Sequence, residues 1–157
     1  MIGLLQRVAG ASVTVEGRCI AAIGRGLLVL VGIERADGAE QARRLAERLL
    51  AFRVFPDAAG RMNLSVTDIG GDVLLVPQFT LVADTRSGNR ASFSRAADPS
   101  AGERLFTALA DECRHAAQRL ALGRFGADMQ VKLVNDGPVT FWLQVTAPPG
   151  PQSTLSV

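Results

Sequence analysis

Gly26-Leu27-Leu28-Val29-Leu30-Val31-Gly32-Ile33 is the longest apolar run in this chain of 157 residues. A helix needs roughly 20 apolar residues to cross a bilayer, so this run is too short to be a membrane span. A short apolar run bounded by glycine is typical of a strand that is buried on both faces. We therefore predict a buried β-strand over residues 27–31 and no membrane association.

The segments around this strand carry mainly strand signals and two helix signals. We predict further strands at residues 2–8, 11–16, 19–23, 52–55, 72–76, 129–134 and 138–146. A helix is predicted over residues 39–51, because apolar side chains recur there at a spacing of three to four. A second helix is predicted from Pro99 to Leu122, ended by Gly123. Residues 84–97 are polar and are expected to form an ordered loop.

This order of elements predicts a single α+β domain over residues 1–146. Strands outnumber helices, so we expect a curved, barrel-like sheet, mixed or antiparallel, with two main helices. A doubly wound fold is not expected. The tail of residues 147–157 contains Pro148, Pro149 and Pro151, and we expect it to be disordered.

Composition and charge exclude several classes of function. Hydrophobic residues make up 48% of the chain and the net charge is +2, so no strongly basic surface is indicated. All basic residues except Lys132 are arginines, which suits either phosphate recognition or a genome rich in Arg codons. Cys19 and Cys113 form no CxxC pair, which argues against a zinc site and favours reduced thiols in the cytoplasm. The first residues do not resemble a signal peptide.

The residue types that usually perform catalysis are scarce. His115 is the only histidine, is placed in the middle of the second predicted helix, and has no GxSxG serine to form a triad. Asp68 and Asp72 flank a glycine turn, where carboxylates are common without a catalytic role. We therefore expect neither a metal nor a cofactor. An enzyme without an acid–base pair needs a substrate that is already reactive or that supplies its own catalytic group.

Two short segments carry the clearest functional signal. Gln78-Phe79-Thr80-Leu81 ends a predicted buried strand, and Gly137-Pro138-Val139-Thr140 sits on the turn between the last two predicted strands. Together they resemble the two signature motifs of the D-aminoacyl-tRNA deacylases, the D-tyrosyl-tRNA deacylase family. The resemblance extends to about Leu143 and includes the segment Met62-Asn63-Leu64-Ser65-Val66.

The resemblance implies a cytoplasmic homodimer that hydrolyses the ester of D-aminoacyl-tRNA at the tRNA 3′ end. In this family a Gly-Pro dipeptide with a cis bond, here Gly137-Pro138, enters the partner's pocket and leaves no room for an L side chain. Glycine, including glycine mischarged on the alanine tRNA, would still be admitted. The aminoacyl ester is a reactive substrate, and the vicinal ribose hydroxyl can assist its hydrolysis.

The same resemblance implies roles for individual residues. The backbone amides around Phe79 and Thr80 would form an oxyanion hole, and Gln78 would shape the adenosine end. Thr80 could instead be a nucleophile, although no base is apparent beside it. The further candidates are Arg7 as a brace for the turn, Met129 as a pocket wall, Val139 and Thr140 as pocket support, and Arg86, Arg90 and Arg95 as contacts to tRNA phosphates or simply solvated loop residues.

One position departs from the family pattern. Pro77 stands where the first motif usually begins with serine, and a sister group of deacylases with looser chirality also has proline there. An alternative function is therefore the removal of small L-amino acids from mismatched tRNA. A second alternative is an RNA-binding module without catalytic activity.

Overall fold

The computed structural model describes residues 1–146, which form an α+β domain with two long helices and a strongly curved sheet. The predicted fold class is therefore confirmed. The predicted tail of residues 147–157 lies outside the described residues. The elements in chain order are β1 (Ile2–Val15), β2 (Arg18–Ile23), β3 (Gly26–Gly32), α1 (Ala39–Ala51), β4 (Phe55–Pro56), β5 (Met62–Leu64), β6 (Asp72–Pro77), the 3-10 helix η1 (Phe79–Val82), α2 (Pro99–Arg114), β7 (Arg119–Leu122) and β8 (Gln130–Gln144).

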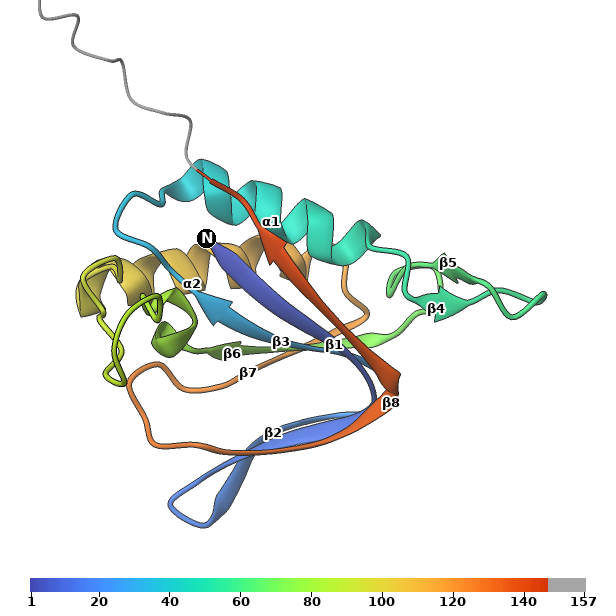
Figure 1. Cartoon of the computed structure of the whole chain (residues 1–157). Coiled ribbons are helices and arrows are strands. Elements are labelled where there is room, and N and C mark those ends of the chain that lie inside the picture. The colour runs from blue at the N-terminus through green and yellow to red at the C-terminus, as the bar shows by residue number, and fades with distance from the viewer. Residues whose placement is uncertain (147–157) are drawn as a thin grey trace, which may run out of the picture.

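The main sheet is mixed and runs in the order β2-β1-β3-β6-β7, with β8 also paired to β1. The pairs β3–β6 and β6–β7 are parallel, whereas the pairs that involve β1 are antiparallel. The first half of β1 pairs with β3 and its second half pairs with β2. The long β1 strand therefore bends the sheet until β2 comes opposite β7, which gives the barrel-like shape (Figure 1).

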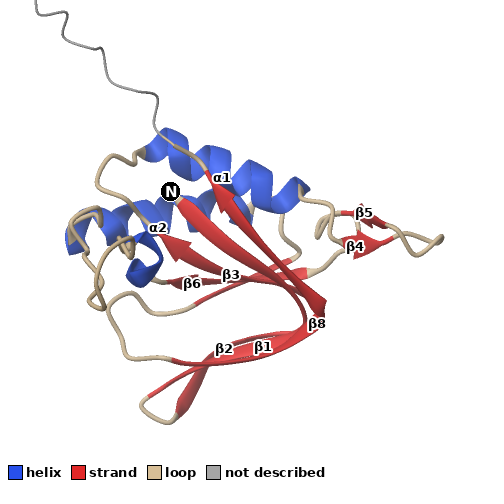
Figure 2. Ribbon diagram, in the orientation of Figure 1, coloured by secondary structure: helices blue, strands red, loops and turns tan. Residues whose placement is uncertain are grey.

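Both helices cover the same side of this sheet (Figure 2). The strand predicted to be buried on both faces is β3, in which Leu27, Leu28 and Val29 are fully buried. Leu27 and Val29 face the core cluster under the helices, while Leu28 faces a second cluster inside the curved half of the sheet. Burial on both faces explains why β3 is a continuous apolar run instead of an alternating one.

The helix starts follow from local chemistry. The Asp98 carboxylate accepts a hydrogen bond of 3.0 Å from the backbone N–H of Ala101, and Pro99 occupies the first turn of α2. At the start of α1 the Gln41 side chain accepts a bond of 2.9 Å from the Gly38 N–H. Each cap satisfies a backbone donor near the start of its helix.

Three predicted boundaries are wrong. Helix α2 ends at Arg114 and not at Leu122, because residues 119–122 form the edge strand β7 and pair in parallel with residues 72–75 of β6. Consequently His115 is the C-cap of α2 and not a mid-helix residue, and Gly123 follows a strand. The first two predicted strands are one strand, β1. The strand predicted at residues 52–55 is only Phe55–Pro56.

Strand β8 also differs from the prediction of two strands that form a hairpin. Both halves of β8 run along the same neighbour, since Asn135 pairs with Val8 and Thr140 pairs with Gln6. The residues between them, 136–139, are extruded from the ladder opposite Arg7. This extruded segment, together with Asn135 and Thr140, is called the Gly-Pro turn below. Within residues 1–146 neither helix is long and apolar enough to cross a membrane.

Candidate active site

A cavity of about 510 Å³ opens where β6 ends. Its walls come from the strand end and the start of η1, from the segment before α2, and from the segment that leads into β8. The lining residues are residues 76–79, Ala96, Ala97, Pro99, residues 125–129 and Val131. Most of these side chains are apolar, with a few polar groups such as Gln78 and Asp128, which is the usual make-up of a small-molecule site.

Glycines make room for the walls of this cavity. A Cβ on Gly32 would lie 2.9 Å from the Cβ of Leu81, so a side chain on β3 there would push η1 away. A Cβ on Gly102 would lie 3.0 Å from the ring of Phe125, and one on Gly123 would lie 3.0 Å from the sulfur of Met129. These close approaches fix η1, Phe125 and Met129 against the core.

The start of η1, where Gln78 and Phe79 line the cavity, has two backbone donors without a hydrogen-bond partner in the described part of the chain. The Gln78 N–H donates to the Val31 carbonyl at 2.8 Å, and the Leu81 N–H donates to the Gln78 carbonyl at 3.3 Å. Among residues 1–146, no hydrogen bond uses the N–H groups of Phe79 and Thr80, which lie between them. Unpaired N–H groups at the start of a helix are suited to bind an oxyanion.

Among residues 1–146, no base forms a hydrogen bond with the Thr80 hydroxyl. This hydroxyl accepts a hydrogen bond from the Gln78 amide. A nucleophilic threonine would need a general base within hydrogen-bond reach, and Gln78 cannot serve as one. This contact supports the structural interpretation of Thr80 over the nucleophilic one.

The Gly-Pro turn is held by two polar side chains. The Asn135 amide accepts a bond of 2.7 Å from the Val139 N–H and donates one of 3.0 Å to the Thr140 hydroxyl. Arg7 donates from Nε to the Asp136 carbonyl at 2.8 Å and from a terminal nitrogen to the Val54 carbonyl at 2.6 Å. One guanidinium therefore ties the turn to the segment before β4.

The backbone of this turn requires glycine at one position. The Gly137–Pro138 peptide bond is cis, and Gly137 has φ +151°. A Cβ on Gly137 would lie 2.5 Å from Cγ2 of Val139 and 2.6 Å from its backbone nitrogen. Both Gly137 and Pro138 are exposed to solvent.

The structure brings together only part of the predicted site. Gln78, Phe79 and Met129 line the cavity, and so does Pro77. The dipeptide Gly137-Pro138 lies elsewhere on the chain and does not line it. Arg7, Val139 and Thr140 belong with the turn, where Arg7 binds the Asp136 carbonyl and the Thr140 hydroxyl accepts a hydrogen bond from the Asn135 side chain.

The three loop arginines lie in different surroundings. Arg86 forms an ion pair with Asp84 at 2.5 Å, and this hydrogen-bonded guanidinium lowers the pKa of the Asp84 carboxyl well below its usual range. Arg95 forms an ion pair with Glu34. Arg90 is exposed and takes part in none of the ion pairs of residues 1–146. Arg90 is thus the least constrained of the three for binding a phosphate.

Sequence reasoning missed Phe125, Gly102 and Phe93 as parts of this region. Phe125 lines the cavity, Gly102 of α2 makes room for its ring, and Phe93 lies against Phe79 with the ring centroids 5.0 Å apart. The signal for Gly102 was a glycine inside a predicted helix, which often marks a close packing contact. The contacts of the two phenylalanines depend on segments that are far apart in sequence.

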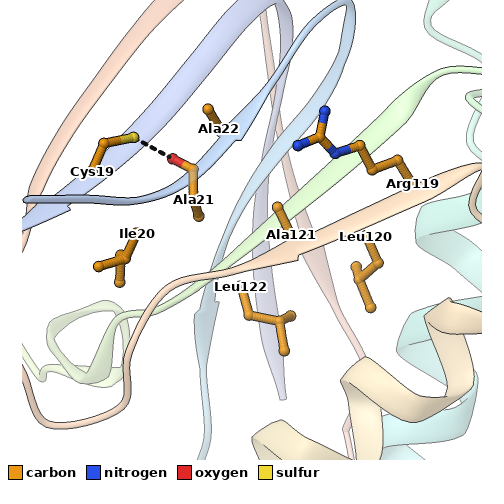
Figure 3. A pocket seen from close by; sticks show the side chains of 8 residues that line it. All are labelled: Cys19, Ile20, Ala21, Ala22, Arg119, Leu120, Ala121 and Leu122. Atoms are coloured by element: carbon orange, nitrogen blue, oxygen red, sulfur yellow. Dashed lines mark hydrogen bonds between the residues drawn. The ribbon is translucent and has the colours of Figure 1, made fainter.

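A second cleft, of about 410 Å³, lies at the seam of the curved sheet, where β2 faces β7. Figure 3 shows the side chains of its lining residues, which are mostly aliphatic apart from Cys19 and Arg119. The Cys19 thiol donates to the Ala21 carbonyl at 3.5 Å. This cleft therefore holds no pair of groups suited to acid–base or nucleophilic catalysis.

The remaining reactive side chains lie outside the cavity. His115 is exposed at the end of α2. Cys113 is fully buried in the core, and this burial raises the pKa of its thiol to about 12. Within residues 1–146 no three His, Cys, Asp or Glu side chains are grouped so that they could hold a metal ion.

An apolar cavity beside two free backbone donors, with no acid–base pair among its lining residues, is suited to a reaction that needs positioning and oxyanion binding more than acid–base chemistry. The chain belongs to the D-Tyr-tRNA(Tyr) deacylase family, whose model matches residues 4–144. The family resemblance predicted from the two motifs is thereby confirmed.

Curated relatives match nearly the full length of the chain. A D-aminoacyl-tRNA deacylase of Alkalilimnicola ehrlichii is 61% identical, over 92% of this chain and 96% of the relative. One of Methylococcus capsulatus is 60% identical, over 96% of this chain and 99% of the relative. One of Escherichia coli O1:K1 / APEC is 57% identical, over 92% of this chain and 100% of the relative.

Solved structures share the fold. One described as "c-Myc DNA Unwinding Element Binding Protein" superposes with a TM-score of 0.89 at 38% identity, covering 94% of this chain and 100% of that one. A second, described as a probable eukaryotic D-amino acid tRNA deacylase, has a TM-score of 0.82 over 92% of this chain and 98% of that one. At 17% identity the second likeness shows the fold alone.

Proposed function

We propose that this protein releases D-amino acids from tRNA by hydrolysing the ester at the tRNA 3′ end. Membership of the family makes the chain a D-aminoacyl-tRNA deacylase, an ester hydrolase. The observation that carries the proposal for its site is the pair of unused N–H groups of Phe79 and Thr80 at the start of η1, where Gln78 and Phe79 line the apolar cavity.

In the proposed mechanism, water attacks the ester carbonyl while the two N–H groups bind the oxygen that becomes negatively charged. The tetrahedral intermediate then collapses, the bond to the ribose oxygen breaks, and that oxygen takes up a proton. The vicinal ribose hydroxyl assists the proton transfers, so the protein needs no general base of its own. Gln78 holds the Thr80 hydroxyl and shapes the adenosine end, and Met129 forms a wall.

Chirality would be read by the Gly-Pro turn of a second copy of the chain. The carbonyls of Gly137 and Pro138 would face the substrate's α-amino group and leave no space for an L side chain. Exposure of this dipeptide and its absence from the cavity of its own chain support delivery to another subunit. Glycine has no side chain to reject, so glycine mischarged on the alanine tRNA would also be cleaved.

A partly exposed apolar face on the sheet supports the homodimer. Leu4 of β1 pairs with Leu30 of β3 on one side and with Trp142 of β8 on the other, so the three side chains lie in one row. Trp142 is 51% exposed. An exposed tryptophan beside two leucines is typical of a protein–protein contact. We propose that this dimer is located in the cytoplasm.

The test is single-turnover hydrolysis of D-Tyr-tRNA and L-Tyr-tRNA by the purified protein. Fast loss of only the D ester is the expected result. Comparable loss of both esters would favour the relaxed sister activity, which the proline at position 77 makes the second candidate. If neither ester decays faster than in buffer, the protein is not this hydrolase and an RNA-binding module becomes the better account.

A further inference from the structure

Two exposed aromatic rings stand at the mouth of the cavity. Phe79 is 61% exposed and Phe93 is 40% exposed, and their ring centroids are 5.0 Å apart at an interplanar angle of 56°. Phe79 lines the cavity, whereas Phe93 lies on the loop of residues 84–97 beyond it. Large aromatic side chains are costly to leave in water, so an exposed pair beside a binding site indicates a ligand surface.

The loop that carries Phe93 is anchored to the domain at several points. Asp84 and Ser92 exchange two backbone hydrogen bonds, of 2.8 and 3.1 Å. The Phe93 carbonyl accepts a bond of 3.0 Å from the N–H of Ala96, which itself lines the cavity. Farther along, the Arg95 carbonyl accepts from Arg35 at 2.8 Å. Phe93 is therefore held at a fixed place relative to the cavity.

We propose that Phe93, together with Phe79, forms a stacking platform for the unpaired base that precedes the terminal adenosine of the tRNA. This inference rests on the proposed function, which puts the terminal adenosine and its ester in the cavity. The single-stranded 3′ end must then leave the cavity past its mouth, where the two rings stand. Flexible unpaired bases are commonly bound by stacking on aromatic side chains.

The charges of the loop fit the same ligand. Arg86 and Arg90 are exposed on the stretch between Asp84 and Ser92, on the loop that carries Phe93. A base that stacks on Phe93 brings its phosphate toward this loop, where a guanidinium can bind it. Aromatic rings that can stack on bases and arginines that can bind phosphates are together better suited to a nucleotide than to an apolar peptide.

The test compares a substrate that contains the preceding nucleotides with one that carries only the terminal adenosine and its ester. The two substrates are D-Tyr-tRNA and D-tyrosyl adenosine, which carries the same ester without the preceding nucleotides. We expect Phe93→Ala to lower kcat/KM for D-Tyr-tRNA by about 10-fold, the size expected for the loss of one base–aromatic stack. The same variant should leave kcat/KM for D-tyrosyl adenosine unchanged.

Matched variants distinguish the effect of a base stacking on the Phe93 ring from the effect of side-chain volume alone. Phe93→Leu keeps an apolar side chain and should behave like Phe93→Ala, whereas Phe93→Trp should retain the activity of the original protein on tRNA. Thr85→Ala, on the exposed part of the same loop, should leave kcat/KM unchanged for both substrates. An equal loss on both substrates, no loss on either, or loss of the dimer in Phe93→Ala would overturn the platform.

A binding measurement keeps this inference separate from the proposed function. Fluorescence anisotropy with an uncharged RNA hairpin ending in CCA requires no hydrolysis. If the protein cleaves neither ester but Phe93→Ala still weakens binding of this RNA about 10-fold, the platform stands and the deacylase proposal fails. If cleavage is intact and binding is unaltered in Phe93→Ala, the platform is wrong and the deacylase proposal is untouched.

Discussion

The cavity and the Gly-Pro turn are built in opposite ways. The cavity wall is packed against the core through glycine contacts at Gly32, Gly102 and Gly123. The turn projects from β8 and is exposed, and its backbone donates a hydrogen bond to Asn135 and accepts one from Arg7. A substitution can therefore damage one without the other. The proposed reaction needs both, although a single chain does not place the turn in its own cavity.

The largest expected effect comes from breaking the turn alone. In Gly137→Ala the new methyl group would meet Val139 at 2.5 Å, so the turn must shift. A displacement of about 1 Å near reacting atoms costs on the order of 100-fold in rate, and we expect a loss of this size in single-turnover hydrolysis of D-Tyr-tRNA. The thermal melting temperature should change little because the turn is exposed. A variant that unfolds at the assay temperature would show instead that the turn is part of the structural core.

A smaller effect is expected when the brace of the turn is altered. Arg7→Lys keeps the charge but cannot reach the Asp136 and Val54 carbonyls with one planar group. We expect deacylation of D-Tyr-tRNA to fall about 10-fold, which is the size of losing a hydrogen bond to a charged donor. The control is Arg43→Lys, an exposed helix residue that pairs with Glu40 and Glu47. Equal rates of D-Tyr-tRNA deacylation by both variants would show that Arg7 does not hold the turn in its active position.

The cavity can be disturbed without touching the turn. In Gly102→Ala the added methyl group would lie 3.0 Å from the ring of Phe125, and the ring is expected to move into the cavity. Activity should fall several-fold on D-Tyr-tRNA and on D-tyrosyl adenosine alike. Alanine favours a helix over glycine by about 1 kcal/mol, which should offset the clash in the free energy of unfolding measured with urea. An unchanged rate would mean that Phe125 does not form a functional wall.

The smallest effect tests the core beneath α2. Burial raises the pKa of the Cys113 thiol to about 12, so it carries almost no thiolate at neutral pH. Cys19 is exposed. Iodoacetamide should therefore label Cys19 alone in the folded protein, with little change in stability, and label both cysteines in urea. Labelling of Cys113 at the same rate as Cys19 in the folded protein would contradict the packing of α2.

Local patterns were sufficient to predict most of the fold. The apolar run of β3 and the spacing of apolar residues in α1 are properties of short segments, and both were predicted within about one residue of their bounds. Strand β7 was missed because Leu120 and Leu122 also fit a continued helix. Residues 119–122 form a strand because they pair with residues 72–75 of β6, which are far away in the sequence.

Only those residues of the candidate site to which the family resemblance assigns a role were predicted from the sequence. Gln78, Phe79 and Met129 were named from the family resemblance, and all three line the cavity. Phe125, Gly102 and Phe93 were missed, because each takes its place through contacts between distant segments. The resemblance also indicated Arg7 beside the turn, where its guanidinium binds the Asp136 carbonyl.

The central claim, that the turn of one subunit completes the cavity of the other, is tested most directly by mixing two inactive variants. Gly137→Ala disables the turn, and Ala127→Trp fills the cavity that Ala127 lines. A mixed dimer then has one site in which an intact cavity meets an intact turn. We predict that subunit exchange restores hydrolysis of D-Tyr-tRNA, whereas verified mixed dimers that stay inactive would contradict a site shared between subunits.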